Sequence, residues 1–151
     1  MLKFTDIEID KSSDEVCVAI LPFGISDYDQ LMKSLYETLE LPGYFGFNWN
    51  ALEECLRDFH WLHQKQVILV HKEIPELPKI ELMTYLDVLA YSVHHWKPGE
   101  AHSLEVIFPS EAQTEVLRLL RQTETWSVAG NEGSLDPVSL DSILDLGNET
   151  G

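Results

Sequence analysis

Residues 41–59 read Leu41-Pro42-Gly43-Tyr44-Phe45-Gly46-Phe47-Asn48-Trp49-Asn50-Ala51-Leu52-Glu53-Glu54-Cys55-Leu56-Arg57-Asp58-Phe59. Proline and glycine end the preceding helical pattern, and a loop rich in aromatic residues follows between two glycines. From Asn48 or Trp49 onward, apolar residues recur with the spacing of one helix face. We therefore expect a loop over 43–47, followed by a short amphipathic helix that begins at Asn48 or Trp49.

This expected helix has one apolar face and one polar face. The apolar face carries Trp49, Leu52, Leu56 and Phe59, and the polar face carries Asn50, Glu53, Glu54, Arg57 and Asp58. Two interpretations fit the pattern. In the first, the apolar residues are core, the acidic stripe is a solvated face and Gly46 is a turn residue with positive φ. In the second, loop and helix form an acidic, aromatic-rimmed interface that anchors in a cationic pocket of a partner, with charge steering the encounter.

Strands and helices alternate on both sides of this stretch. We expect strands over 16–21, 67–70 and 104–108, and residues 2–9 also alternate in part like a strand. The first of these runs is continuously apolar, which is typical of a strand buried on both faces. Helical spacing predicts helices over 28–39 and 79–96, and Ser110 with Gln113 fits a capping box that opens another over 110–125. Strands separated by helices predict an α/β fold with a small parallel sheet.

Length and charge narrow the classes of partner. The chain has 151 residues and a formal net charge of −16, which corresponds to about one domain in an acidic protein. Such a field repels phosphate backbones and anionic lipid, so we expect no nucleic-acid or membrane partner and instead a basic protein. No apolar run spans a bilayer and no signal peptide is visible, so the expected location is the cytoplasm. Cys17 and Cys55 are expected to be reduced, buried thiols.

The sequence offers no strong catalytic, metal or cofactor motif. A Gly-x-Ser-x-Gly elbow and a phosphate-binding glycine loop are both missing. His60 and His63 lie one turn apart, and His94, His95 and His102 offer further ring nitrogens, but the usual ligand spacings of zinc sites are not found. Histidines near a helix C-terminus also complement its dipole. We therefore expect no enzyme and no cofactor, and a hydrolase built on the histidines is the least favoured alternative.

Residues 41–59 resemble the signature of the barstar family, which is roughly Leu-Pro-x-Tyr-(Tyr/Phe)-Gly-x-Asn-(Leu/Trp)-Asp-Ala-Leu-x-Asp-Cys-Leu. The resemblance covers about residues 15–109, with the preceding helix and the following strand in the same order. It implies a three-stranded parallel sheet packed by helices. It also implies an intracellular inhibitor of secreted microbial ribonucleases, in which the loop and second helix block the nuclease active site by presenting carboxylates where RNA phosphates would lie.

The resemblance also implies a set of partner-binding residues. They are Tyr44, Phe45, Gly46, Asn48, Asn50, Glu53 and Glu54. Tyr44 matches the interface tyrosine of the loop, and Glu54 falls where the family has the aspartate that enters the phosphate site. Asn50 falls where the family has another interface aspartate, so this charge is lost. The family's acidic position on the helix before the last strand falls near Tyr91 or Ser92, neither of which is acidic.

We expect three segments and one main function. The segments are a barstar-like domain over 1–109, an additional C-terminal helix over 110–125 and an acidic, partly disordered tail over 126–151, with a short helix near 139–146. The expected function is inhibition of a basic ribonuclease, or immunity against a nuclease toxin. The alternative is a barstar-like interaction module without a nuclease target, which acts through residues 126–151. Sequence alone leaves the oligomeric state and the identity of the partner open.

Overall fold

The computed structural model describes residues 1–9, 12–130 and 140–145. Within these residues, one sheet of parallel strands has the order β2-β3-β4-β1-β5. The elements in chain order are β1 (Leu2–Phe4), β2 (Val16–Leu21), α1 (Tyr28–Thr38), α2 (Trp49–Leu56), β3 (Gln66–His71), α3 (Lys79–His95), β4 (Ser103–Phe108), the 3-10 helix η1 (Ser110–Ala112), α4 (Gln113–Gly130), α5 (Leu140–Ile143) and β5 (Leu144–Asp145). The predicted α/β class with a parallel sheet is confirmed.

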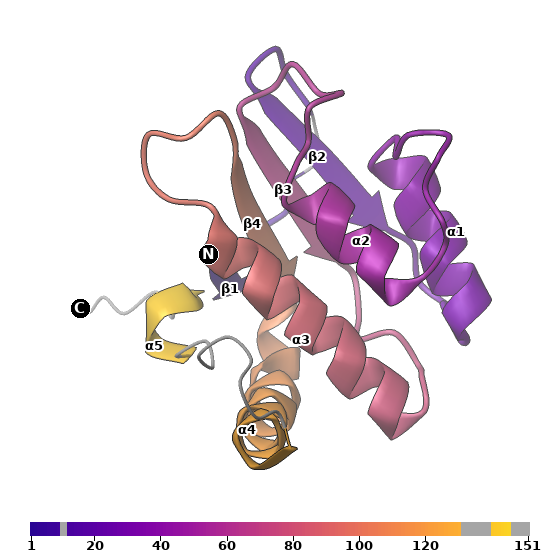
Figure 1. Ribbon diagram of the computed structural model, residues 1–151, viewed down its shortest axis with the longest axis vertical. Helices are drawn as coiled ribbons and strands as arrows, with labels where there is room; N and C mark the ends of the chain where they lie inside the picture. The colour runs from indigo at the N-terminus through magenta and orange to yellow at the C-terminus, as the bar shows by residue number, and fades with distance from the viewer. Residues whose placement is uncertain (10–11, 131–139, 146–151) are drawn as a thin grey trace.

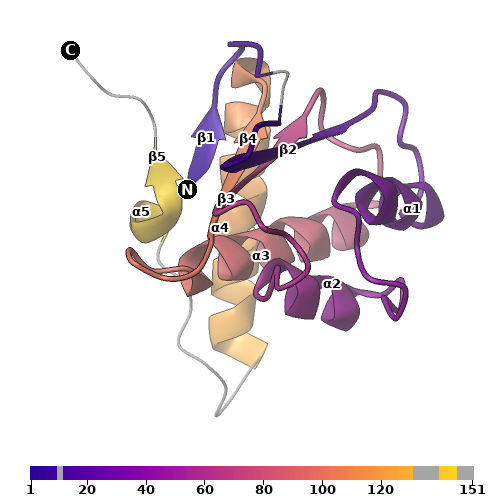
Figure 2. The same cartoon turned by 90° about the horizontal axis from the view of Figure 1, so that it is seen from above.

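The core lies between the sheet and the helices α1, α2 and α3, which cover one face of the sheet (Figures 1 and 2). Each of these helices turns an apolar stripe inward, as the helical spacing of its sequence predicts. The fully buried residues of α1 and α2 are Leu31, Met32, Leu35, Leu52 and Leu56. Cys17 and Cys55 are free, buried thiols, which confirms the prediction for both. Helix α2 is therefore held by its apolar face, and its polar face is left to solvent.

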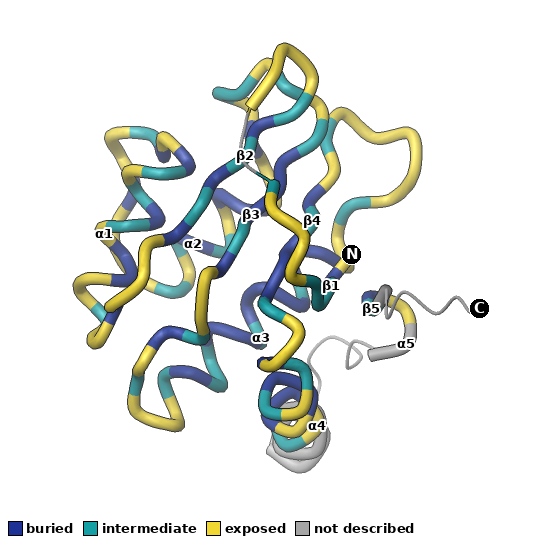
Figure 3. Tube along the Cα trace, turned by 180° about the vertical axis from the view of Figure 1, so that it is seen from behind, coloured by how far each residue is buried: buried dark blue, intermediate teal, exposed yellow. Residues whose placement is uncertain are grey.

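Among the described residues, no helix covers β2 and β3 on the opposite face of the sheet, which is seen from behind in Figure 3. The strand β2 accordingly alternates between buried and half-buried residues, with Cys17, Ala19 and Leu21 directed to the core. The expectation that this strand is buried on both faces is therefore wrong. Residues 5–9 line a hollow with Ile20 and Val70 on this face, and this partial cover explains why an apolar run is tolerated there.

Two strands extend the sheet beyond the three that the family resemblance implies, and the first of them, β1, covers only residues 2–4 of the partly alternating stretch 2–9. In β1, Leu2 is paired in register with Val106 of β4, and on its other side with Leu144 of β5. Leu2 and Ile143 are buried where these pairs form. The two added strands are three and two residues long. The alternation of residues 2–9 indicated the first, whereas β5 is too short for an alternating pattern to show in the sequence. The three-stranded expectation is corrected to a sheet of five strands within the described part of the chain.

The C-terminal elements also differ in detail from the prediction. The backbone N–H of Ser110 donates to the carboxylate of Asp6 at 3.0 Å, and the Ser110 hydroxyl donates to the other oxygen. The predicted capping box between Ser110 and Gln113 does not form, because the Ser110 hydroxyl binds Asp6 instead. Helix α4 continues to Gly130. Of the expected short helix, residues 140–143 form α5, while positions 139 and 146 and the remaining tail residues 131–138 and 147–151 lie outside the described residues.

Candidate functional site

The loop before α2 is built on aromatic packing. The Phe45 N–H donates to the Pro42 carbonyl at 2.9 Å, which closes a turn. The Phe45 ring is buried and lies 4.8 Å from the ring of Phe47 and 6.3 Å from that of Tyr36. Tyr44, on the outside of this turn, is 63% exposed. The loop therefore anchors through Phe45 and presents Tyr44 to solvent.

Gly46 has a role other than the positive-φ turn that was expected. The left-handed residue of this loop is Phe47, with φ of 53°, whereas Gly46 has no positive φ. A Cβ at Gly46 would lie 3.0 Å from Nδ2 of Asn48 and 3.6 Å from Cβ of Ala51. Glycine is therefore favoured at position 46 by the close approach of the following helix, and the backbone strain falls on Phe47 instead.

Asn48 fixes the first turn of α2. Its side-chain oxygen accepts the Ala51 N–H at 2.8 Å, and its Nδ2 donates to the Gly46 carbonyl at 3.1 Å. The residue has extended backbone, as an N-cap requires. The predicted start of the helix at Asn48 or Trp49 is confirmed. Asn48 thus contributes to the site by shaping it, with its side chain occupied by backbone groups.

The polar face of α2 divides into two parts. Glu53 is half-buried, and its carboxylate accepts a hydrogen bond from Arg57 at 2.9 Å. Asn50 and Glu54 are exposed. The ion pair neutralises part of the charge of Glu53, so Glu54 carries the more available negative charge of the two glutamates.

Glu54 borders a hollow of about 250 Å³ on the surface of the molecule. The hollow is lined by Tyr44, Phe45, Ala51, Glu54, Cys55 and Asp58. Its floor is apolar, and its two carboxylates stand four residues apart, just where α2 ends. Asp58 also contacts Nδ1 of His60 at 2.7 Å. Three of the predicted site residues, Tyr44, Phe45 and Glu54, therefore meet at one place, together with Asp58, which the set of predicted site residues omitted.

The negative charge of this hollow acts on its neighbours. Desolvation raises the pKa of the Tyr44 hydroxyl, and the charges of Cys55, Asp58 and Glu54 raise it further. Burial raises the pKa of the Cys55 thiol to about 11, with further contributions from Asp58 and Glu54. Cys55 is therefore a thiol at neutral pH and not a nucleophile. The arrangement suits the binding of a positive charge beside an aromatic ring.

A further carboxylate lies near the seam between α2 and α3. Burial and then the charge of Glu53 together raise the pKa of Asp87 to about 6. Asp87 also raises the pKa of Tyr91, after the effect of burial. Sequence analysis missed Asp87 because only the packing of α3 against α2 brings it near Glu53. Asp58, in contrast, was visible in the acidic stripe of the helix.

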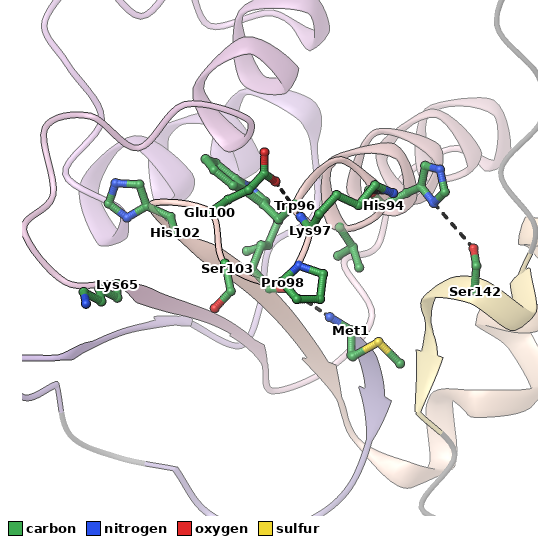
Figure 4. Close-up of a pocket in the computed structure, with 13 residues that line it drawn as sticks. Met1, Lys65, His94, Trp96, Lys97, Pro98, Glu100, His102, Ser103 and Ser142 are labelled. Atoms are coloured by element: carbon green, nitrogen blue, oxygen red, sulfur yellow. Dashed lines mark hydrogen bonds between the residues drawn. The ribbon is translucent and has the colours of Figure 1, made fainter.

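A further hollow, with a volume of about 600 Å³, lies at the amino-terminal edge of β3 and β4 (Figure 4). Two of the basic side chains that line it contact backbone carbonyls. The Lys97 ammonium donates to the His94 carbonyl at 2.8 Å, and Nδ1 of His102 donates to the Gln64 carbonyl at 2.9 Å. Lys97 complements the C-terminal end of α3, and His102 ties the segment before β4 to the segment before β3, so both side chains have a structural role.

The described residues show neither a metal site nor a membrane-spanning helix. Across residues 1–9, 12–130 and 140–145, no three His, Cys, Asp or Glu side chains are grouped to hold a metal ion. His60 is in contact with Asp58, while His63 is exposed. No helix in the same residues has the length and apolar character needed to cross a membrane.

Comparison with known proteins adds one family. The model of the family described as barstar (barnase inhibitor) matches residues 17–126, which is more than two thirds of the chain. The match includes α2, the loop before it and most of α4, so it extends beyond the resemblance seen over 15–109. No curated protein matches the chain.

Proposed function

The chain belongs to the barstar family, and from that membership we propose that it inhibits a basic ribonuclease or confers immunity against a nuclease toxin. Membership itself indicates a protein-interaction role of the barnase-inhibitor kind. The family is one of inhibitors, so we propose no catalytic role and no cofactor. The proposed site is the loop 43–47 with the outer face of α2.

The observation that carries this proposal is the hollow between Tyr44, Glu54 and Asp58. A nuclease holds RNA phosphates with basic side chains, and carboxylates are the groups that replace phosphate oxygens in charge and in hydrogen bonding. Glu54 and Asp58 place two carboxylates at one small surface. The formal charge of −16 adds a field that speeds the approach of a basic partner.

The site residues have different proposed roles. Glu54 is the main carboxylate. Asp58 supplies a second negative charge, which the uncharged Asn50 does not. Tyr44 packs against the partner through its exposed ring. Phe45, Gly46 and Asn48 hold the loop and the helix start, and Glu53 contributes less because Arg57 already binds it.

Capture of the partner tests this proposal. Immobilised wild-type protein and a Glu54→Ala variant are incubated with lysate and culture medium of the source cell, and Glu111→Ala serves as the control. Glu111 is an exposed acid on η1, away from α2. A basic nuclease retained by the wild type and the control, but lost with Glu54→Ala, supports the proposal. Retention by all three proteins would show that α2 is not the main binding surface.

One observation favours a second candidate function, a barstar-like interaction module without a nuclease target. Asn50 removes a charge that the family places on the outer face of this helix, so a different partner is a reasonable alternative. This candidate predicts that the captured protein has no nuclease activity. It also predicts that a chain ending at residue 130 loses the partner while Glu54→Ala retains it.

A further inference from the structure

Phe47 is the residue with a strained backbone in the loop 43–47. Its φ of 53° is in the left-handed region, which is uncommon and strained for a bulky residue. The residue precedes the N-cap Asn48, so the direction in which α2 leaves the loop depends on the two peptide planes that flank Phe47. A conformation of this kind persists only where neighbouring groups fix it.

Both of these peptide planes are held by side chains. The carbonyl of Gly46, before Phe47, accepts Nδ2 of Asn48 at 3.1 Å. The carbonyl of Phe47 accepts the hydroxyl of Tyr28 at 2.8 Å. Tyr28 is the first residue of α1 and lies 19 residues away in the sequence. The second of the two contacts is therefore the one that ties the loop to another element.

Tyr28 is itself held by a series of packed rings. Its ring packs edge-on against Trp49, the first residue of α2, with ring centroids 5.2 Å apart. Trp49 lies 6.2 Å from the ring of Tyr85 on α3, and the Tyr85 hydroxyl lies 2.6 Å from Nε2 of the buried His71. Burial, followed by the charges of Asp29 and Glu81, raises the pKa of Tyr28, so its hydroxyl stays a donor at neutral pH.

We propose that Tyr28 is a positioning residue, which pins the Phe47 carbonyl to α1 and so presents Tyr44 and Glu54 in the geometry that a partner binds. The conformational part of this inference stands on the contacts above, and its effect on binding rests on the proposed function. Tyr28 is half-buried, and its hydroxyl is directed to the loop. It acts through the loop and needs no contact with the partner.

Two tyrosine-to-phenylalanine variants on the same helix form a matched pair for the test. Tyr28→Phe removes the hydroxyl that binds Phe47. Tyr36→Phe removes a hydroxyl for which the described residues show no hydrogen bond, while its ring stays against Phe45 and Phe47. NMR then measures the hydrogen-exchange rates of three backbone amides. The Phe45 N–H closes the loop turn, and the Ala51 and Leu52 N–H groups close the first turn of α2. The Gln30 N–H, which donates to the side chain of the N-cap Asp27, shows whether α1 itself is disturbed.

The inference predicts that the exchange rates of these three amides are about fivefold higher in Tyr28→Phe than in the wild type, the factor expected for the loss of one hydrogen bond. Tyr36→Phe and the Gln30 amide are expected to remain unchanged. Equal exchange in both variants would overturn the inference whether or not a partner exists. Against the captured partner, Tyr28→Phe is expected to lower the association rate about fivefold, because fewer molecules have the binding geometry. Faster exchange with an unchanged association rate would overturn the positioning role, whereas failure of the wild type to capture any partner would count against the proposed function.

Discussion

The Arg57 guanidinium lies 2.9 Å from the carboxylate of Glu53, one helical turn before it. This pair makes the two adjacent glutamates of α2 unequal, because Glu53 has a cation beside it and Glu54 borders the hollow with Asp58. The sequence shows two neighbouring acids, and the structure shows that only one is available to a partner without first breaking an ion pair.

Removal of Arg57 is predicted to strengthen partner binding. Arg57→Ala frees Glu53 and makes the site more negative, so the association rate is expected to rise about two- to fivefold at low salt and to approach the wild-type rate at high salt. The stability is expected to change by less than about 1 kcal/mol, since the pair is exposed. Arg118→Ala is the control, because Arg118 forms a comparable exposed pair with Glu115 on α4. An equal effect of both variants would assign the change to net charge alone.

A side chain at Gly46 is predicted to be destabilising because of a steric contact, and not because of the backbone φ angle. Gly46→Ala places a Cβ 3.0 Å from Nδ2 of Asn48, so the N-cap must shift, and a loss of about 1 kcal/mol in unfolding free energy is expected. At Gly43 a Cβ meets nothing within 4 Å, and Gly43→Ala is expected to change stability by less than about 0.5 kcal/mol. Urea unfolding of both variants checks this. Equal losses would contradict the contact with Asn48 as the cause.

His71 is predicted to make stability depend on pH. Its Nδ1 lies 3.1 Å from the Ile107 carbonyl, which can only accept, so this nitrogen carries the proton and Nε2 accepts from Tyr85. Burial lowers the pKa of His71 to about 3 in the folded chain, compared with about 6.5 when unfolded. The unfolded chain therefore binds the proton first as the pH falls, and stability is full above about pH 6.5 and declines toward pH 3.

A His71→Gln variant isolates this effect from the other titrating groups. The variant is expected to be less stable than the wild type at pH 7.5, because the hydrogen bonds of His71 to the Ile107 carbonyl and the Tyr85 hydroxyl are lost. The wild-type advantage in urea unfolding is then expected to shrink by about 2 kcal/mol between pH 7.5 and pH 5. An advantage that stays constant over this range would show that His71 does not stay neutral in the folded chain.

Asp87 is predicted to have the opposite pH dependence. Its pKa is raised to about 6 by burial and then by Glu53, so the folded chain binds this proton more tightly than the unfolded chain does. Its contribution to stability is therefore present below about pH 4 and is lost as the pH rises through 6. Asp87→Asn is expected to stabilise the protein by about 1 kcal/mol at pH 8, an amount reduced by the remaining contact with water. No gain at pH 8, or an equal gain at pH 4.5, would contradict this account.

The parts of the site that could be predicted are those that local sequence determines. Asn48 was recognisable as an N-cap, and the helical stripe placed Glu54 and Asp58 on one side. The strain at Phe47 was assigned to Gly46, because a sequence does not show which loop residue the following helix approaches. Asp87 and the contact of Tyr28 with Phe47 depend on how α1 and α3 pack against α2. The pairing of Leu2 with Leu144 joins residues more than a hundred positions apart, and the two-residue strand β5 leaves no local pattern.

The most direct test of the central claim is a titration of the captured partner's RNA-hydrolysing activity with wild-type protein and with Glu54→Gln, which keeps the shape of the side chain and removes its charge. The account predicts that hydrolysis falls to zero at one equivalent of the wild type, and that Glu54→Gln requires at least tenfold more protein, in agreement with the loss of a main interface charge. Hydrolysis that continues at full rate in an excess of bound wild-type protein would contradict the claim that α2 blocks a nuclease active site.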